Sequence, residues 1–177
     1  MALHEHIRHT PILSASEAPI RMIGAFAESV GQATDLTQVG ECILRILSEQ
    51  LRLPKAAIWI REANGEYHLL ASLGHSTLAA LPASLPDNHA LITGLSDRLH
   101  LLRYDQASSS PAGSAMISIQ AAVCLPLRNK TQFLGLCALG PIGTECHLDE
   151  DTVIIAETVA RIACNTLDHH LAQDDLR

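Results

Sequence analysis

The feature that most constrains this fold is the segment 119–140, which reads IQAAVCLPLRNKTQFLGLCALG. It consists of two apolar runs of strand length, joined by the polar tetrapeptide 128–131 (RNKT). Apolar runs of this length between turn residues predict strands that are buried on both faces. Pro126 cannot donate a hydrogen bond to a sheet, so we expect it near the end of its strand or at a bulge. Gly135 has no side chain, which indicates that another segment approaches its backbone closely.

The composition is typical of a globular protein from the cytoplasm. The length of 177 residues favours one domain, and a content of 47% hydrophobic and 18% charged residues is not that of a disordered chain. The net charge of −7 argues against general binding to nucleic acid. No apolar run approaches the roughly 20 residues that span a bilayer. Five cysteines, an odd number without a CxxC pair, favour free thiols in a reducing compartment. We therefore expect a cytoplasmic protein without nucleic-acid or membrane partners.

The first part of the chain predicts two consecutive helices. Apolar residues at helical spacing indicate a helix over 17–33. The second helix begins after a cap at Asp35 and ends near Leu51. Gln38 stands three residues after Asp35, which is the spacing of a capping box. The expected apolar stripe of the first helix consists of Ile20, Ile23, Ala27 and Val30.

A strand hairpin follows, with strands at 55–62 and 67–73. Asn64-Gly65 between them is a strong signal for a two-residue turn. A turn at that place pairs Trp59 with Leu70 across the two strands. Both faces of the strands are apolar, so both need cover, and an antiparallel sheet with helices on each side provides it.

The second half of the chain predicts an insert, the opening hairpin and one long helix. In the insert we expect a helix at 87–96, capped by Asp87, and a short strand within 99–103. Residues 104–114 read as a loop that leads into a short helical turn. The final helix covers about 148–171, and the carboxylates of its first turn suit the helix dipole.

These elements predict an α+β fold. We expect an antiparallel sheet of about five or six strands, with the terminal helices on one face and the insert on the other. Residues 1–15 are expected to be a flexible arm, 16–172 a single domain and 173–177 a tail. The terminal helices are apolar over more than one stripe, so we expect the surplus apolar surface to form a homodimer interface.

At this point the chain resembles a GAF domain, a relative of the PAS domains, over residues 17–170. The resemblance rests on the paired helices, the hairpin at Asn64-Gly65, and the segments Leu125-Pro126-Leu127 and Phe133-Leu134-Gly135-Leu136, similar to the family's PL…hhGhL core, where h is apolar. It implies a non-enzymatic sensory or regulatory module that holds a small ligand between sheet and insert. Such modules signal through their terminal helices to an output domain or partner protein. We expect the chain to act alone or as the sensor part of a longer protein.

The resemblance also implies where a ligand would lie. Arg103 is the residue that we expect to meet an anionic ligand, because a guanidinium binds oxyanions through two hydrogen bonds. An aromatic content of 3% favours a small ligand or none. The sequence names no cofactor and no metal ligands. The expected polar lining consists of His89, Asp97, Arg98, His100, Arg103, Tyr104, Asp105, Ser108, Ser109 and Ser110, and the strand register decides whether Cys124 and Cys137 form the floor.

Three specialised activities of GAF domains lack their residues in this chain. Bilin-binding members use a cysteine in the segment that corresponds to 104–118, which has none, and Cys146-His147 follows the hairpin instead. Free methionine sulfoxide reductases need two cysteines in the insert, and 74–118 contains none. The Asn-Lys pair of cyclic-nucleotide binders follows the next strand, whereas Asn129-Lys130 falls in the hairpin turn. No catalytic residue is therefore predicted.

Three alternatives to ligand sensing remain open at this level. The first is a ligand-free dimerisation scaffold. The second is a redox sensor: if Cys124 faces Gly135, then Cys124 and Cys137 are diagonal neighbours on one face, and a shift of one residue puts them on opposite faces. The third is a haem or metal sensor that uses some of the ten histidines, of which His4, His6 and His9 cluster in the arm. No zinc-type spacing supports it.

Overall fold

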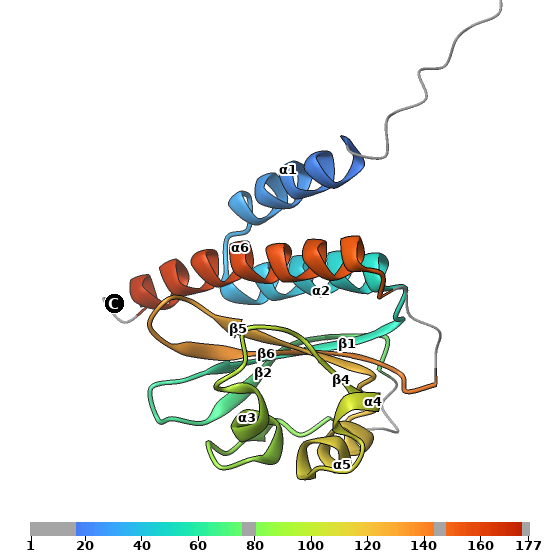
Figure 1. Ribbon diagram of the computed structural model, residues 1–177. Helices are drawn as coiled ribbons and strands as arrows, with labels where there is room; N and C mark the ends of the chain where they lie inside the picture. Colours follow the sequence, from blue (N-terminus) through green and yellow to red (C-terminus); the bar gives the residue numbers. More distant parts are fainter. Residues whose placement is uncertain (1–16, 76–80, 144–147, 175–177) are drawn as a thin grey trace, which may run out of the picture.

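The computed structural model describes residues 17–75, 81–143 and 148–174, which form one antiparallel sheet between two helical layers (Figure 1). The predicted arm 1–15, the Cys146-His147 pair and most of the predicted tail lie outside the described residues. The sheet has the order β3-β2-β1-β6-β5-β4. The predicted α+β fold is therefore confirmed. The strands are β1 (Lys55–Arg61), β2 (Tyr67–Leu73), β3 (Ser84–Leu85), β4 (Leu102–Arg103), β5 (Val123–Arg128) and β6 (Phe133–Gly140).

Helices cover both faces of the sheet (Figure 1). Helices α2 and α6 lie on one face, and the short helices α3, α4 and α5 of the insert lie on the other. Helix α1 lies on the outer side of α2 and α6. Among the described helices, none combines the length and apolarity that crossing a membrane requires. The helices are α1 (Glu17–Gly31), α2 (Leu36–Leu51), α3 (Ala90–Leu95), α4 (Tyr104–Ala107), α5 (Pro111–Ser118) and α6 (Glu150–Asp174).

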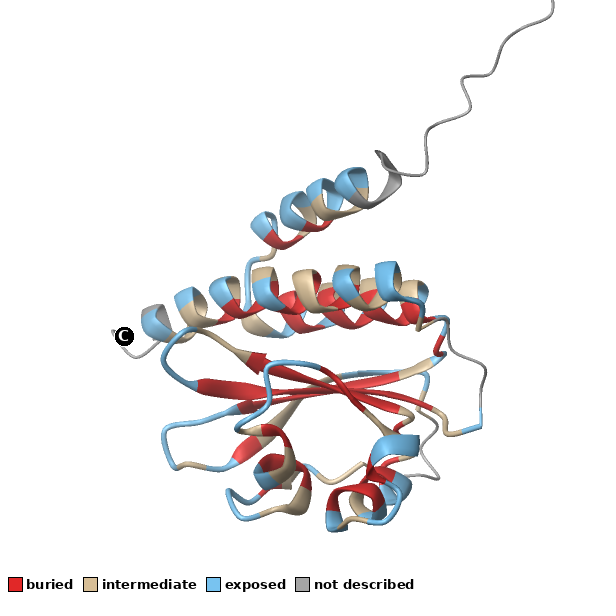
Figure 2. Cartoon of the chain, in the orientation of Figure 1, coloured by how far each residue is buried: buried red, intermediate tan, exposed pale blue. Residues whose placement is uncertain are grey.

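The sheet separates two apolar cores, and its central strands are buried on both sides (Figure 2). Ile58 and Leu125 belong to the core under α2 and α6. Trp59 and Leu136 belong to the core under the insert. Every residue of β6 is buried, as the apolar run predicts. The unbroken apolar run of β6 therefore reflects a strand that helices cover on both faces of the sheet, as predicted.

Gly135 and Pro126 have the roles that their chemistry predicts. A Cβ at Gly135 would lie 2.0 Å from the carbonyl oxygen of Trp59, so neighbouring β1 leaves no room for a side chain. Pro126 lies close to an irregularity in the pairing of β5 with β6, between Leu127 and Arg128. This position suits a residue that has no N–H to donate.

The first hairpin differs from the predicted register near its turn. Trp59 pairs with Leu69 and not with Leu70. The turn is longer by one residue than predicted: the N–H of Gly65, at φ 88°, donates to the carbonyl of Glu62 at 2.9 Å. A shift of one residue reverses the faces. Leu69 therefore packs under the insert beside Trp59, and Leu70 packs under α2.

The second hairpin settles the positions of the two strand cysteines. Cys124 pairs with Ala138, and the pairing with Gly135 that would make the thiols neighbours does not occur. The side chain of Asn129 determines the turn, because its Oδ1 accepts the backbone N–H groups two and three residues further on, at 2.9 and 2.8 Å. Cys124 lies in the core under the insert and Cys137 in the core under α6, on opposite faces of the sheet.

The helices of the insert differ from the prediction in extent and in their cap. Helix α3 begins at Ala90, and the cap is His89 rather than Asp87. The predicted loop 104–114 contains α4 and the beginning of α5. The side chain of Ser110 caps α5 by accepting the N–H of Gly113 at 3.2 Å. Serine is a common helix cap, but Ser110 stands in a serine-rich run that is equally typical of a loop.

The apolar stripe predicted for α1 is only partly correct. Phe26 and Val30 are buried against α2 and α6, whereas Ile20 is 70% exposed and Ala27 is exposed. The cap predicted for α2 is confirmed, since Asp35 Oδ1 accepts the N–H at the third helical position at 2.8 Å.

Candidate functional site

The space between the sheet and the insert is occupied by the protein's own apolar side chains. Trp59, Leu91, Met116 and Leu136 meet there, and each is 0% exposed. The indole Nε1 of Trp59 donates to the carbonyl oxygen of Pro82 at 3.0 Å, which fixes the ring. A small ligand on the insert face of the sheet therefore either displaces these core side chains or binds at the outer surface of the insert.

A cleft of about 300 Å³ opens between α3, α4 and α5, and we call it the insert cleft. Its floor is apolar, since Leu102, Ala107 and Ala112 are all buried. Its volume lies at the lower end of the range for small-molecule sites, roughly 300–1,000 Å³. The insert cleft is lined by Ala90, Thr93, Gly94, Arg98, Leu102, Gln106, Ala107, Ser110, Pro111 and Ala112.

Small residues let the helices of the insert approach closely and form this cleft. A Cβ at Gly94 would lie 3.0 Å from the Cβ of Ala112, so α3 and α5 pack closely against each other at this point. A Cβ at Gly113 would lie 2.1 Å from the carbonyl oxygen of Ala107, which brings the start of α5 against the end of α4. A larger side chain at Gly113 would separate the walls of the cleft.

Arg98 contributes a positive charge to the insert cleft. Its Nε donates to the carbonyl oxygen of Gly94 at 3.1 Å, a bond that orients the guanidinium beside the end of α3. Within the described part of the chain Arg98 makes no ion pair. Arg103, the expected anion-binding residue, is instead paired with Asp105 at 3.0 Å and does not line the cleft. The guanidinium that is free to meet an anion here is therefore that of Arg98.

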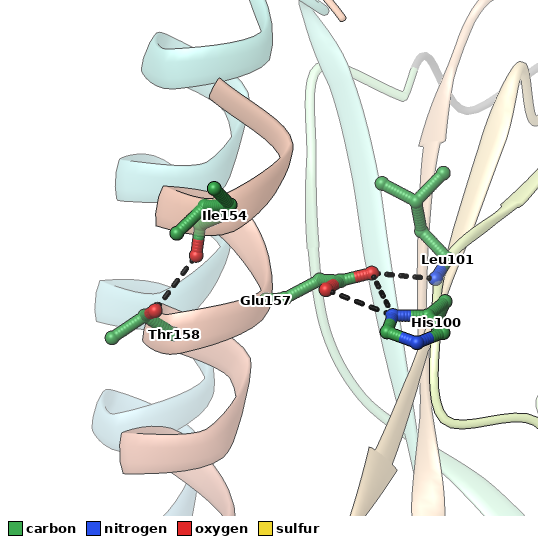
Figure 3. Close-up of polar contacts among 5 residues, drawn as sticks. All are labelled: His100, Leu101, Ile154, Glu157 and Thr158. Carbon is green, nitrogen blue, oxygen red and sulfur yellow. Dashed lines mark hydrogen bonds and ion pairs between the residues drawn. The ribbon is translucent and has the colours of Figure 1, made fainter. Parts of the chain in front are cut away.

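On the other face, the insert is tied to the long helix α6 (Figure 3). Glu157 extends from α6 towards the segment that precedes β4, and its Oε1 accepts the backbone N–H of Leu101 at 3.1 Å. The Nδ1 of His100 lies 3.1 Å from both carboxylate oxygens. The side chain of Glu157 is 17% exposed and that of His100 is 79% exposed.

A second contact ties the insert to the sheet. Arg128 of β5 donates from its guanidinium to the carbonyl oxygen of Ser96 at 2.8 Å. Ser96 is the residue that ends α3. The segment 96–101, which carries Arg98, is therefore held at its start by β5 and at its end by α6.

Beside these contacts lies a second hollow, of about 460 Å³, between α6, β5 and the residues before β4. We call it the edge groove. It lies on the helix face of the sheet, opposite the insert cleft. The edge groove is lined by Leu99, His100, Leu125, Pro126, Arg128, Asn129, Lys130, Glu157, Ala160, Arg161 and Asn165.

Solved structures with the same arrangement identify the fold. The GAF domain of a phosphoenolpyruvate-protein phosphotransferase from Coxiella burnetii superposes with a TM-score of 0.72 at 18% identity, over 92% of this chain and 99% of that one. The corresponding domain from Acinetobacter gives 0.71 at 12% identity, over 89% and 98%. This chain has the GAF fold. The GAF domain of a putative sensor histidine kinase from Pseudomonas syringae pv. tomato gives 0.63 at 13% identity, over 92% and 93%. No protein-family model and no curated protein matches the sequence.

Within this GAF fold, only Arg98 and Ser110 of the predicted ligand residues line the insert cleft. His89 accepts the N–H of Leu91 through Nδ1 and so serves as a helix cap. His100 faces α6 on the opposite side of the sheet. Of the remaining predicted residues, Asp97, Asp105, Ser108 and Ser109 are exposed on the insert, Tyr104 packs partly against the core beneath it, and Cys124 is buried in that core. Cys137, a candidate for the floor, lies instead in the core under α6, on the opposite face of the sheet.

The GAF core also holds three thiols in an unreactive state. Burial raises the pKa of Cys124 and that of Cys164 to about 12, and it raises the pKa of Cys137 well above its usual value. A thiol reacts as its thiolate, so these cysteines stay protonated and inert near neutral pH. Among the described residues, no three His, Cys, Asp or Glu side chains gather as metal ligands would. The predicted histidine cluster of the arm lies outside these residues.

Thr93, Gln106 and Glu157 are functional candidates that sequence reasoning missed. Thr93 and Gln106 line the insert cleft. Neither belongs to a charged cluster or a known motif, so only the packing of α3 against α5 reveals them. Glu157 lies 56 positions from Leu101, and no periodicity in the sequence relates two residues at such a separation.

Proposed function

We propose that this chain is a non-enzymatic sensory or regulatory domain that binds a small anionic ligand in the insert cleft. The observation that carries the proposal is Arg98, whose guanidinium stands at the cleft above an apolar floor and makes no ion pair with a described residue. An apolar cleft with a few convergent polar groups is the usual form of a small-molecule site. The GAF fold supports the proposal, because its neighbours include a domain of a putative sensor histidine kinase.

The signal, in this proposal, passes from Arg98 to α6. Arg98 belongs to the segment 96–101, whose ends are bound by Arg128 and Glu157. A ligand that draws Arg98 towards the insert cleft displaces this segment and so alters the contact of Glu157 with Leu101. A ligand shifts such an equilibrium only by its difference in affinity for the two arrangements. The guanidinium is the group that supplies this difference.

We further propose that the domain acts in the cytoplasm as a homodimer through its terminal helices. Ile20 on α1 is 70% exposed and Ile154 on α6 is 54% exposed, and a second copy would cover them. Residues 16–172 form the folding unit in this proposal. The signal leaves through α6 to an output domain or a partner protein.

A ligand-free dimerisation scaffold is the second candidate. The observation that favours it is the filled space under the insert, where Trp59, Leu91 and Met116 are all 0% exposed. A scaffold needs no cavity between sheet and insert. The two functions differ in whether any small molecule stabilises the fold.

A thermal-shift screen with nucleotides, amino acids, 2-oxo acids and inorganic anions distinguishes them. A compound at a hundredfold excess over its dissociation constant adds about 2.7 kcal/mol to the stability of a ligand-binding form. We expect at least one anion to raise the melting temperature of the wild type, and Arg98→Ala to abolish the rise. Arg103→Ala is the matched control, because Arg103 is paired with Asp105 outside the cleft. Melting curves that no compound shifts would favour the scaffold.

A further inference from the structure

We propose that the edge groove is a second binding site, which takes a small organic anion with an apolar body. The groove lies on the α6 face of the sheet, opposite the insert cleft, and no residue lines both. Its volume of about 460 Å³ is within the range of small-molecule sites. The proposal concerns the ligand chemistry of this groove and stands apart from the function proposed for the insert cleft.

The floor of the groove is apolar. Leu125 and Pro126 of β5 and Ala160 of α6 form it, and all three are buried. Leu99 stands at the groove with 72% of its surface exposed. Covering the side chain of Leu99 with the apolar body of a ligand removes that surface from water, which favours binding.

The charged residues of the groove favour an anion. Arg128, Lys130 and Arg161 are basic, and among the described residues Glu157 is the one carboxylate that lines the groove. Glu157 is engaged by the N–H of Leu101 and by His100, and Arg128 is engaged by the carbonyl of Ser96. This local excess of positive charge contrasts with the net charge of −7 of the whole chain.

Two of the cations are available to a ligand. Lys130 in the hairpin turn and Arg161 on α6 are exposed, and neither makes an ion pair with another residue of the described ranges. Asp168, the next acid along α6 after Glu157, is engaged by Asn129 at 3.1 Å and does not line the groove. An anionic group between Lys130 and Arg161 places its apolar body on the floor beneath them.

A ligand at this place touches three parts of the chain at once. Arg161 belongs to α6, Lys130 to the turn after β5, and Leu99 to the segment that Glu157 ties down. Its binding therefore favours the arrangement in which Glu157 and Leu101 are in contact. A site of this kind opposes any movement of the segment 96–101 away from α6.

Anilinonaphthalene sulfonate is a suitable probe, because it is a fluorescent anion with an apolar body. We expect saturable binding to the folded wild type, and competition by hexanoate but not by hexanol at the same concentration. The double variant Lys130→Ala/Arg161→Ala should bind the probe more weakly, with a dissociation constant at least about fivefold higher than that of the wild type. Arg21→Ala/Arg45→Ala removes the same charge from exposed positions on α1 and α2 and should leave binding unchanged.

The results that overturn the proposal are specific. Wild-type protein that does not bind the probe saturably contradicts it, and so does an equal loss of affinity in the two double variants. Arg98→Ala separates this site from the insert cleft, because it should leave binding of the probe unchanged. Loss of probe binding in Arg98→Ala alone would assign the probe to the insert cleft and refute the edge groove as its site.

Discussion

Glu157 on α6 accepts a hydrogen bond from the backbone N–H of Leu101 at 3.1 Å, across 56 positions of sequence. The same carboxylate lies 3.1 Å from the imidazole Nδ1 of His100 (Figure 3). Leu101 directly precedes β4, the short edge strand between α3 and α4 of the insert. One side chain of the long terminal helix therefore positions the segment that joins α3 to β4 within the insert.

Loss of this contact should destabilise the fold measurably. Glu157→Ala leaves the N–H of Leu101, which is partly buried, without its acceptor, and we expect the free energy of unfolding to fall by about 1–3 kcal/mol. Arg161→Ala, one turn further along α6 on its exposed side, should change it by less than about 0.5 kcal/mol. Urea denaturation at neutral pH measures both. A loss in Glu157→Ala no larger than that in Arg161→Ala would contradict the assigned role.

Gly135 gives a second test of the packing. A Cβ there would meet the carbonyl oxygen of Trp59 at 2.0 Å, so Gly135→Ala requires β1 and β6 to separate, and we expect it to destabilise by more than about 3 kcal/mol. Gly24→Ala is the matched control, since nothing lies within 4 Å of its added Cβ and the site is inside α1. Alanine should stabilise that helix by roughly 0.5–1 kcal/mol. Thermal unfolding of both variants checks the opposite signs.

The thiols should differ strongly in reactivity. Burial raises the pKa of Cys124 and that of Cys164 to about 12, and that of Cys137 rises well above its usual value, so none of them forms a thiolate near pH 8. In a Cys146→Ser background we expect Ellman's reagent to modify one thiol of the folded protein rapidly, that of the half-buried Cys42. Rapid modification of two or more thiols, without unfolding, would show that the core is open.

His89 should make the fold sensitive to acid. Burial lowers the pKa of His89, and its neutral Nδ1 accepts the N–H of Leu91 at the start of α3. The stabilisation is present above the unfolded pKa of about 6.5 and is lost as the pH falls through the lowered pKa of the folded state. Asparagine caps helices without titrating, so His89→Asn should lose less stability than the wild type between pH 7.5 and pH 5. Urea denaturation at the two pH values compares them, and equal losses would contradict the assigned role of His89.

Much of the fold follows from local patterns in the sequence. The uninterrupted apolar runs of β5 and β6 predict burial on both faces, and every residue of β6 is buried. Asp35 predicts the start of α2, and Gly135 predicts the close approach of another strand, which is β1. These features depend on residues that are neighbours in sequence or on the chemistry of a single residue. They need no knowledge of the rest of the molecule.

The register of the hairpins does not follow from such patterns. The turn after β5 depends on the side chain of Asn129, and the turn after β1 contains one residue more than Asn64-Gly65 predicts. The longer first turn moves Leu69 and Leu70 to the faces opposite to those predicted, and the register of the second hairpin, which the sequence leaves open, places Cys124 and Cys137 on opposite faces. A difference of one residue in a turn therefore decides on which face of the sheet a side chain lies.

The predicted polar lining of the site has the same difficulty, because its residues come from one stretch of sequence. Arg103 and Asp105 pair with each other on the surface, while His100 faces α6. Arg98 obtains its place in the insert cleft from the packing of α3 against α5. Contacts between distant segments, such as that of Glu157 with Leu101, leave no pattern in a single sequence.

Hydrogen exchange of Glu157→Ala tests the central claim, that α6 and the insert are coupled through this residue, most directly. We expect faster exchange than in the wild type for peptides that cover 99–118, while peptides from β1 and β6 keep their rates. Arg161→Ala should exchange as the wild type does throughout. Unchanged exchange over 99–118 in Glu157→Ala, or the same acceleration in both variants, would contradict the coupling.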